Sequence, residues 1–523
     1  MEQKKKKRIV IISIILTLIV LLFFITKAII KNKLEQYLSN LPEQIELKYE
    51  DLSIGLLSGD VVFDGFKVNL KGQTTGQSNG FVQSKKMSLK GFSYWDYMVN
   101  KTINVSSIIA NQPEVTYYHN PLASTSKGSQ AMFDDIKQKV TVDDFKIKNA
   151  KIEVFDLEKD AVLLKTENLD FSLTDFIFNG KQARDTKNPF QFKNVALKIN
   201  DLEYQVNNFE TLSFNELIFD NNTTAISDLK LKTKLSKENL SNQLQTERDH
   251  FDLHIPKIKI ENQDFHFKGA KLLAFSSKNM TVSDLNLTIF RDKLVADDLT
   301  NKAMYSKMLR DLDIQLDLKA IQIINGSITY QEKVKKDTQA GTLDFKNFNA
   351  KLSNVSNTYH DSQTTINIDC IFMENTPLQV NWSFNVNNLQ DHFTFKADIG
   401  NLKAEALNQF MTPNLNLKLE GDLKQTLFTI DGNAVTSNVD LKTKYNQFDI
   451  IILKENGNEK NKLLSGIINL FVSKDSKGQS DNFRNSDTKQ VTRDNTKSVF
   501  NFIWKNTQSG LISAMAGDGT KEN

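Results

Sequence analysis

The chain has 523 residues, of which 39% are hydrophobic and 25% charged, with one cysteine and a formal net charge of +3. This composition is that of a folding chain rather than a disordered or collagen-like one. A single cysteine excludes an intramolecular disulfide framework and a cysteine-rich zinc site. Residues 1–8 contribute +4, so the other 515 residues sum to −1. A nucleic-acid binder needs a basic face on its folded part, so the near-neutral body argues against nucleic acid as a partner.

Residues 9–30 form an apolar run after the basic residues 1–8. At about 1.5 Å per residue, a helix of this length covers roughly 33 Å, enough to cross a bilayer. The run is longer than the core of a cleaved signal peptide and lacks a small-residue cleavage site, so we favour an uncleaved transmembrane anchor. The positive-inside rule then puts residues 1–8 in the cytoplasm and the body beyond the membrane. Representative anchor residues are Ile9, Ile15, Leu21, Phe24 and Ile30.

The body is dominated by apolar residues that alternate with polar ones, the pattern of strands with one apolar and one wet face. We interpret the Asn-, Asp- and Gly-containing breaks as turns. At about 14 residues per strand and turn, residues 41–472 predict about 30 strands. We therefore expect a mainly β fold, an elongated and twisted antiparallel sheet whose apolar face forms a groove. The candidate groove-lining residues are Phe66, Val68, Leu70, Ile258, Ile260, Val380, Trp382, Phe384 and Val386.

One segment of the body recurs. Residues 145–154 match residues 321–330 at a constant offset of 176, sharing Asn149 with Asn325 and a small residue at 150 and 326. We favour an internal repeat over a chance match between β sequences, and predict a strand, a small-residue turn and a returning strand in each copy.

The C-terminal part differs in composition. Residues 473–497 lack aliphatic side chains except Val491 and predict a disordered linker. Residues 498–516 have apolar residues at helical spacing and predict an amphipathic helix. We favour docking of this helix on the open end of the sheet. The alternative is contact with a membrane or a partner through Phe500, Ile503 and Trp504.

The sequence lacks the motifs of common catalytic and cofactor-binding sites. There is no P-loop, dinucleotide-binding or nucleophile-elbow pattern. His250 and His254 lie in an alternating segment, where strand geometry separates them by about 13 Å, too far to share a metal. Cys370 alternates with two isoleucines and is interpreted as a small core or groove residue. We expect no enzyme activity, no metal and no cofactor.

Two stretches carry a family resemblance. The first is residues 49–68, which follow the anchor. The second is residues 402–472, notably Leu402–Pro413, Leu419–Leu423, Phe428–Asn433, Tyr445–Ile450 and Ile467–Val472. They resemble the AsmA-like family of Gram-negative envelope proteins, whose relatives include TamB and the chorein-type bridge lipid-transfer proteins. Residues 499–505 with Gly510 resemble the ending of AsmA-like proteins from Bacteroidetes-type bacteria. The middle of the chain shares the general character of the family but no specific motif. Ser437–Val439 departs from the family, which usually has a glycine there.

This resemblance implies groove repeats over 31–400, a C-terminal β module over 401–472, and no catalytic residues. It also implies an inner-membrane anchor, a periplasmic body, phospholipid as the ligand and a role in outer-membrane biogenesis or order. An apolar trough would keep each CH₂ of an acyl chain from water, worth about 0.8 kcal/mol. A scaffold or assembly factor for outer-membrane proteins, with an envelope protein as partner, is the alternative function. A surface adhesin or polysaccharide-handling protein is a third.

Overall fold

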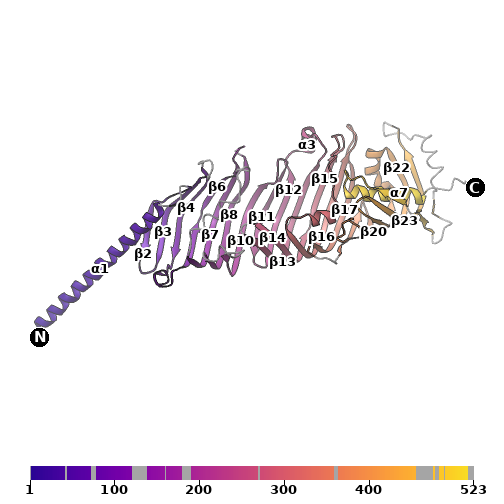
Figure 1. Cartoon of the computed structure of the whole chain (residues 1–523). Coiled ribbons are helices and arrows are strands. Elements are labelled where there is room, and N and C mark those ends of the chain that lie inside the picture. Colours follow the sequence, from indigo (N-terminus) through magenta and orange to yellow (C-terminus); the bar gives the residue numbers. More distant parts are fainter. Residues whose placement is uncertain are drawn as a thin grey trace, which may run out of the picture. The chain divides into compact units, whose positions relative to one another are not determined.

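The computed structural model describes residues 2–39, 41, 44–71, 78–119, 138–158, 161–179, 190–268, 271–358, 363–454, 475–476, 482–487 and 489–515 (Figure 1). Strands make up 61% and helices 17%, so the expected mainly β fold is confirmed. The chain divides into two compact units. Unit 1 comprises Met1–Gln205 and Asn215–Asn221, and unit 2 comprises Val206–Phe214 and Asn222–Asn523.

Unit 1 consists of a long helix followed by a sheet. Its elements are α1 (Glu2–Ser39), β1 (Ile45–Lys48), β2 (Asp51–Gly55), β3 (Asp60–Lys71), β4 (Ser78–Lys90), the five-residue π-helix η1 (Asp96–Asn100), β5 (Thr102–Asn111), β6 (Glu114–His119), β7 (Lys139–Asp156), β8 (Val162–Asn179), β9 (Phe190–Gln191) and β10 (Asn194–Gln205), and β11 (Glu210–Asp220) is divided between the units. Over the residues that the structure describes, no helix has the length and apolar character needed to span a membrane. The side chains of the predicted anchor residues Ile9 and Ile15 lie outside the described set.

Unit 2 carries a larger sheet with several short helices. Its elements are β12 (Thr223–Thr233), α3 (Lys237–Gln243), β13 (Asp249–Lys268), β14 (Lys271–Ser283), β15 (Asn286–Asp292), α4 (Tyr305–Arg310), β16 (Gln315–Lys333), β17 (Gly341–Ser356), β18 (Thr364–Phe372), β19 (Thr376–Phe384), β20 (Phe393–Ile399), β21 (Leu402–Lys403), η2 (Ala404–Leu407), α5 (Asn408–Leu415), β22 (Leu417–Gly432), β23 (Thr436–Ile452), β24 (Arg484–Asn485), β25 (Lys489–Thr492) and α7 (Val499–Met515).

The sheet in each unit is mixed, so the expected purely antiparallel sheet is wrong. In unit 1, β5 and β6 both pair in parallel with β7 and antiparallel with β4. In unit 2, β14 and β15 have the same relation to β16 and β13. Each pair therefore acts as one broken strand between two long strands. A parallel neighbour requires a crossover connection, and in unit 2 the chain between β15 and β16 supplies it and includes α4.

Some polar breaks that predicted turns are turns, such as Asn221–Asn222 between β11 and β12, whereas others are bulges inside long strands. Asn149 in β7 and Asn325 in β16 have φ values of 52° and 55°, and the strands continue through them. In both, the backbone N–H donates to a side chain of the next strand, at 2.8 Å to Asp170 and 2.9 Å to Asn349. The predicted turn in each copy of the repeat is thus wrong. Asn and Asp tolerate the left-handed conformation, so they suit a bulge as well as a turn.

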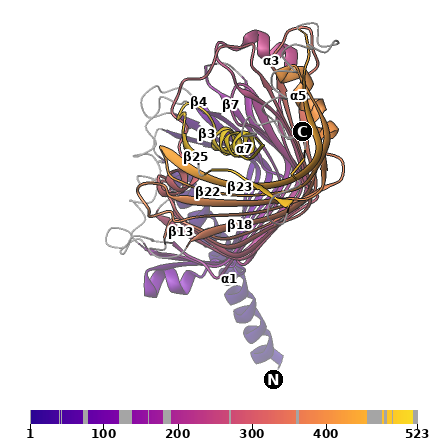
Figure 2. The same cartoon turned by 90° about the vertical axis from the view of Figure 1, so that its right-hand side faces the viewer.

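Each bulge switches which alternate residues face one side. In β13, Leu253 and Ile255 before Pro256 join the same apolar cluster as Ile258 and Ile260 after it. The bulges also align across neighbouring strands of unit 2, with Asp228, Asp284, Asn325 and Asn347 in left-handed conformation in β12, at the β14–β15 break, in β16 and in β17. Aligned bulges bend a sheet, and Figure 2 shows the strands of unit 2 curving around α7.

Candidate functional site

One face of the unit 2 sheet carries an unbroken row of apolar side chains. Ten consecutive neighbours pair directly across ten strands: Ile226, Ile258, Val282, Ile323, Ala350, Ile368, Val380, Ala397, Phe428 and Leu441. We call this set the apolar row and its side of the sheet the inner face. At about 4.8 Å per strand, nine steps cover roughly 43 Å.

A second apolar row runs beside the first on the inner face. Its members are Ile260, Met280, Ile321, Leu352, Ile366, Trp382, Phe395, Ile430 and Val439, each opposite the next. Two adjacent rows of this kind make a continuous apolar strip across nine strands of unit 2.

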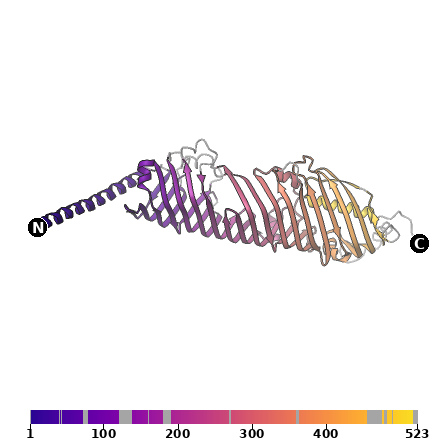
Figure 3. The same cartoon turned by 90° about the horizontal axis from the view of Figure 1, so that it is seen from below.

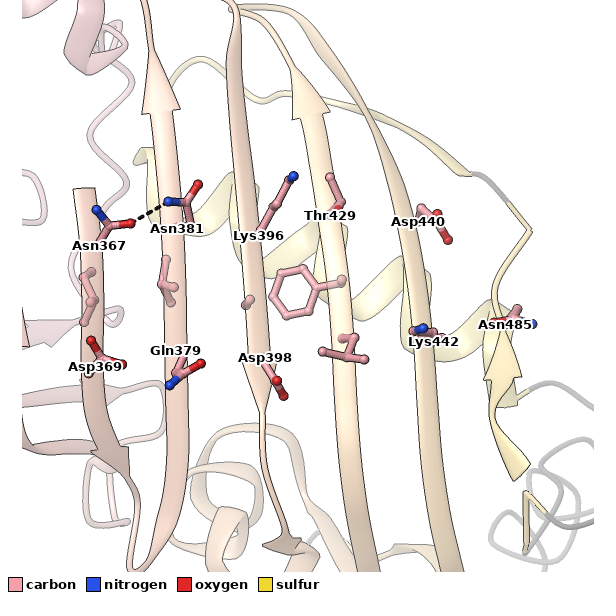
Figure 4. Close-up of a pocket in the computed structure, with 15 residues that line it drawn as sticks. Asn367, Asp369, Gln379, Asn381, Lys396, Asp398, Thr429, Asp440, Lys442 and Asn485 are labelled. Atoms are coloured by element: carbon pink, nitrogen blue, oxygen red, sulfur yellow. Dashed lines mark hydrogen bonds between the residues drawn. The ribbon is translucent and has the colours of Figure 1, made fainter. Parts of the chain in front are cut away.

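The opposite face is polar. A shallow pocket of about 580 Å³ lies there over β18 to β24. Figure 4 shows Asn367, Asn381 and Lys396 in it, with α7 behind the strands. Asn381 Nδ2 donates to Asn367 Oδ1. Polar side chains therefore gather on this face of β18 to β24, as the sequence alternation predicts.

Helices cover the C-terminal part of the inner face. The predicted lining residues Val380, Trp382, Phe384 and Val386 are only 3–9% exposed and belong to a core with residues of α7 and with Met304, next to α4. The Tyr305 ring of α4 lies 5.4 Å from Trp382. These four positions therefore form a helix-covered core rather than an open groove wall.

Helix α7 confirms the predicted C-terminal helix, but it docks on the inner face of β23 and not on the open end. Gly510 allows the close approach, since a Cβ there would lie 2.8 Å from Leu441 Cβ. Asn506 is fully buried and accepts a hydrogen bond from Ser437 Oγ at 2.8 Å. Of the predicted contact residues, Ile503 is buried, whereas Phe500 and Trp504 are 63% and 39% exposed.

The chain before α7 is folded where the structure describes it. Strands β24 and β25 pair with β23, so the predicted disordered linker over 473–497 is wrong for these residues. The remainder of that range lies outside the described residues, as does Ile467–Val472, which the family resemblance uses.

Charged contacts tie this segment to the β15–α4 connection. Lys497 Nζ lies 2.7 Å from Asp297 Oδ2 and 3.8 Å from Glu247, which also pairs with Lys293 at 2.6 Å. The hydrogen bond from Lys497 lowers the pKa of Asp297. Arg493 also donates to the Lys302 carbonyl oxygen. No local pattern in the sequence indicates this cluster, because Lys497 lies 200 residues from Asp297 and 250 residues from Glu247 in the chain.

A separate apolar cluster lies on the inner face of β12 to β16. It is formed by residues of strands and bulges and, among the described residues, includes no residue of a helix. Ile255, Ile258, Val282 and Leu285 are buried beside the bulges, while Ile226, Leu229, Leu253, Ile260, Met280, Leu287 and Ile323 are half-buried. The predicted lining residues Ile258 and Ile260 both lie in this cluster, which we call the aliphatic floor.

Unit 1 has the same kind of face. Seven residues pair in order across β2, β3, β4, β5, β7, β8 and β10: Leu52, Phe63, Met87, Ala110, Ile147, Phe171 and Leu197. Predicted lining residue Phe66 lies beyond the left-handed Gly65, and its ring is 5.8 Å from Phe63 on the same face. Val68 and Leu70 continue along β3, half-buried, with Val68 opposite Val82.

Three titratable residues stand out in the sequence, His250, His254 and Cys370, and each lies in a strand. His250 and His254 both lie in β13, as predicted, and contact the Leu235 carbonyl oxygen at 3.0 Å and Asp228 at 3.2 Å. Cys370 is buried, and this burial raises the pKa of its thiol to about 12. Among the described residues, no group of three or more His, Cys, Asp or Glu side chains is arranged to hold a metal ion.

Comparison with known protein families and with curated proteins finds no match to this chain. The resemblance to the AsmA-like family therefore stays a prediction, carried by the residues quoted for it.

Proposed function

We propose that the protein holds phospholipid by its acyl chains on the inner face and conducts it along the strip of apolar residues. The observation that carries this proposal is the part of the apolar row outside the helix-covered core, which comprises Ile226, Ile258, Val282, Ile323 and Ala350. An acyl chain gains about 0.8 kcal/mol for each CH₂ kept from water. Because these five residues follow one another without a polar interruption, an acyl chain can shift from β12 to β17 without giving up that gain, while a headgroup stays in solvent.

The aliphatic floor is the place where we propose that lipid binds. Its residues come from β12 to β16, and all are aliphatic or methionine. Sites for small polar ligands combine an apolar lining with a few convergent polar groups. The floor has an apolar lining alone, which suits a hydrocarbon chain rather than a sugar or a nucleotide.

We also propose that α1 anchors the chain in the inner membrane, with the body in the periplasm of a Gram-negative bacterium. Leu18, Ile19, Leu21, Leu22 and Phe24 of α1 are all largely exposed. A contiguous apolar surface of this kind is costly in water and is typical of a membrane- or protein-binding segment. The basic residues 1–8 and the resemblance to the AsmA-like family support the same orientation.

Photocrosslinking in cells tests the lipid site directly. A photoreactive amino acid replaces Ile260, which belongs to the aliphatic floor, or its neighbour Lys259, which is exposed. We expect phospholipid adducts at position 260 and not at 259. Equal lipid labelling at both positions, or none at 260, would contradict the proposal. Protein adducts at 260 without lipid would instead favour an assembly factor for outer-membrane proteins.

A further inference from the structure

An exposed apolar patch lies at one end of the unit 1 sheet. In and beside η1, Trp95, Tyr97, Met98 and Val99 are 70%, 48%, 62% and 54% exposed, and Leu57 in the β2–β3 turn is 91% exposed. The Phe92 N–H donates to the Gly59 carbonyl oxygen at 2.9 Å, which joins the two loops. We call these five residues the η1 patch. Large apolar side chains grouped on a surface mark an interaction site.

The loop that displays the patch is tightly built. Ser93 Oγ accepts from the Asp96 N–H at 3.2 Å, and Asn100 Nδ2 donates to Asp96 Oδ1 at 2.7 Å. The Phe92 ring packs 5.7 Å from Tyr97 on the inner side of the loop. A π-helical turn is rare and occurs often at functional sites. Because the loop is closed by its own hydrogen bonds, it presents its apolar side chains outward in a fixed arrangement.

Helix α1 leaves unit 1 from the same end. Figures 2 and 3 show the purple coil of η1 beside the place where α1 projects from the sheet. The exposed apolar residues of α1 and those of η1 thus occur together in one unit. Trp and Tyr side chains are enriched where a bilayer meets water, because their rings are apolar and their N–H and O–H groups bond to headgroups or water. Lys101, which follows η1, is exposed and carries the charge that anionic headgroups attract.

We infer that the η1 patch enters the surface of the bilayer in which we propose that α1 is anchored, so that unit 1 is held to the membrane at two points. This inference rests on the anchor in the proposed function. A second contact with the membrane, in addition to the helix, would fix the orientation of the unit 1 sheet above it. The occupant of the patch is then the interfacial layer of lipid rather than a protein partner.

Fluorescence quenching by brominated lipid tests the inference in the full chain. Cys370→Ala removes the native thiol, and single cysteines are placed at Met98, at Ile19 in α1, or at Glu158. Thr102, which follows η1, pairs with Lys139 at the start of the 18-residue β7, and Glu158 follows the far end of that strand. Exposed Glu158 is therefore a control on the order of 50 Å away. Each variant is labelled at its single cysteine with an environment-sensitive fluorophore. The labelled protein is then reconstituted into vesicles of phosphatidylcholine and phosphatidylglycerol with brominated acyl chains.

We expect the emission of labels at positions 98 and 19 to be quenched and that of the label at 158 to be retained. Trp95→Asp should weaken quenching at 98 and leave quenching at 19 unchanged. Quenching at 19 without quenching at 98 would overturn the inference while the anchor stands. A lack of quenching at 19 would refute the anchor itself, and the inference with it.

Discussion

The charge variant Ile323→Asp tests whether the apolar row conducts lipid. Ile323 lies in β16, half-buried, between Val282 and Ala350 of the row. A carboxylate at this position would stand in the path of an acyl chain with no polar group of the row beside it. An uncompensated buried polar group costs about 1–3 kcal/mol in proteins, and 1.4 kcal/mol corresponds to a factor of ten. A penalty of about 2 kcal/mol predicts roughly 30-fold slower lipid transfer.

The neighbouring residue supplies the matched control. Gln322→Asp adds the same charge to the same strand, on an exposed side chain of the opposite face. Both variants are purified as full chains and checked by circular dichroism. Transfer of a fluorescent phospholipid from donor to acceptor vesicles is then measured. We expect Gln322→Asp to transfer lipid like the natural sequence and Ile323→Asp to be slow.

Two results would refute this reasoning. A folded Ile323→Asp protein that transfers lipid at the natural rate would show that lipid does not pass over the row. An equal loss in both variants would indicate a general effect of charge on membrane encounter rather than a block on the inner face.

Three further predictions concern the bulges and the docking of α7. Asn325 adopts a φ of 55°, a left-handed conformation that asparagine tolerates better than alanine because its short side chain can hydrogen-bond locally. Asn325→Ala should therefore lower the free energy of unfolding by about 1 kcal/mol in urea titration, with Asn325→Gly closer to the natural chain; an unchanged Ala variant would remove the argument from backbone conformation. Gly510→Ala should release α7 by overpacking against Leu441, at a cost of about 1–3 kcal/mol, and so speed proteolysis within α7. Since alanine favours an isolated helix, slower cleavage would contradict the docking geometry. Lys497 lowers the pKa of Asp297. The stabilisation that this pair adds to the folded state is therefore complete above the unfolded carboxyl pKa near 4, and it is lost as the pH falls through the lowered pKa. Lys497→Met should therefore flatten the acid-induced change in Trp fluorescence, and an identical acid profile would count against the pair.

The fold class follows from features that the sequence displays directly. Alternation places one set of side chains on one face, and helical spacing over 498–516 predicts a helix at nearly the observed bounds, Val499–Met515. Both signals are local, so they can be interpreted without knowing which strands pair.

The pairing itself could not be predicted. Alternation is the same in a parallel and an antiparallel neighbour, so the broken strand formed by β14 and β15 was not visible. Asn325 predicts a turn as well as a bulge, because both use a left-handed residue. The distinguishing sign is the change of phase between Ile323 and Ile328, where apolar residues switch from odd to even positions.

The helices that cover the inner face could not be predicted from local sequence patterns either. Val380 and Trp382 alternate just as Ile258 and Ile260 do, yet the first two lie beneath helices and the latter two belong to the aliphatic floor. What covers a strand is decided by segments far away in the chain, here α4 and α7. A charge at Val380 would therefore disrupt the core, and Ile323 is the better position for testing transfer.

Native mass spectrometry of the purified full chain tests the central claim most directly. The protein is extracted from membranes in mild detergent, and the bound molecules are released and identified. We predict phospholipid that remains bound to the natural chain and to Gln322→Asp and is depleted in Ile323→Asp. A natural chain that is free of lipid and does not take it up from vesicles would contradict the account.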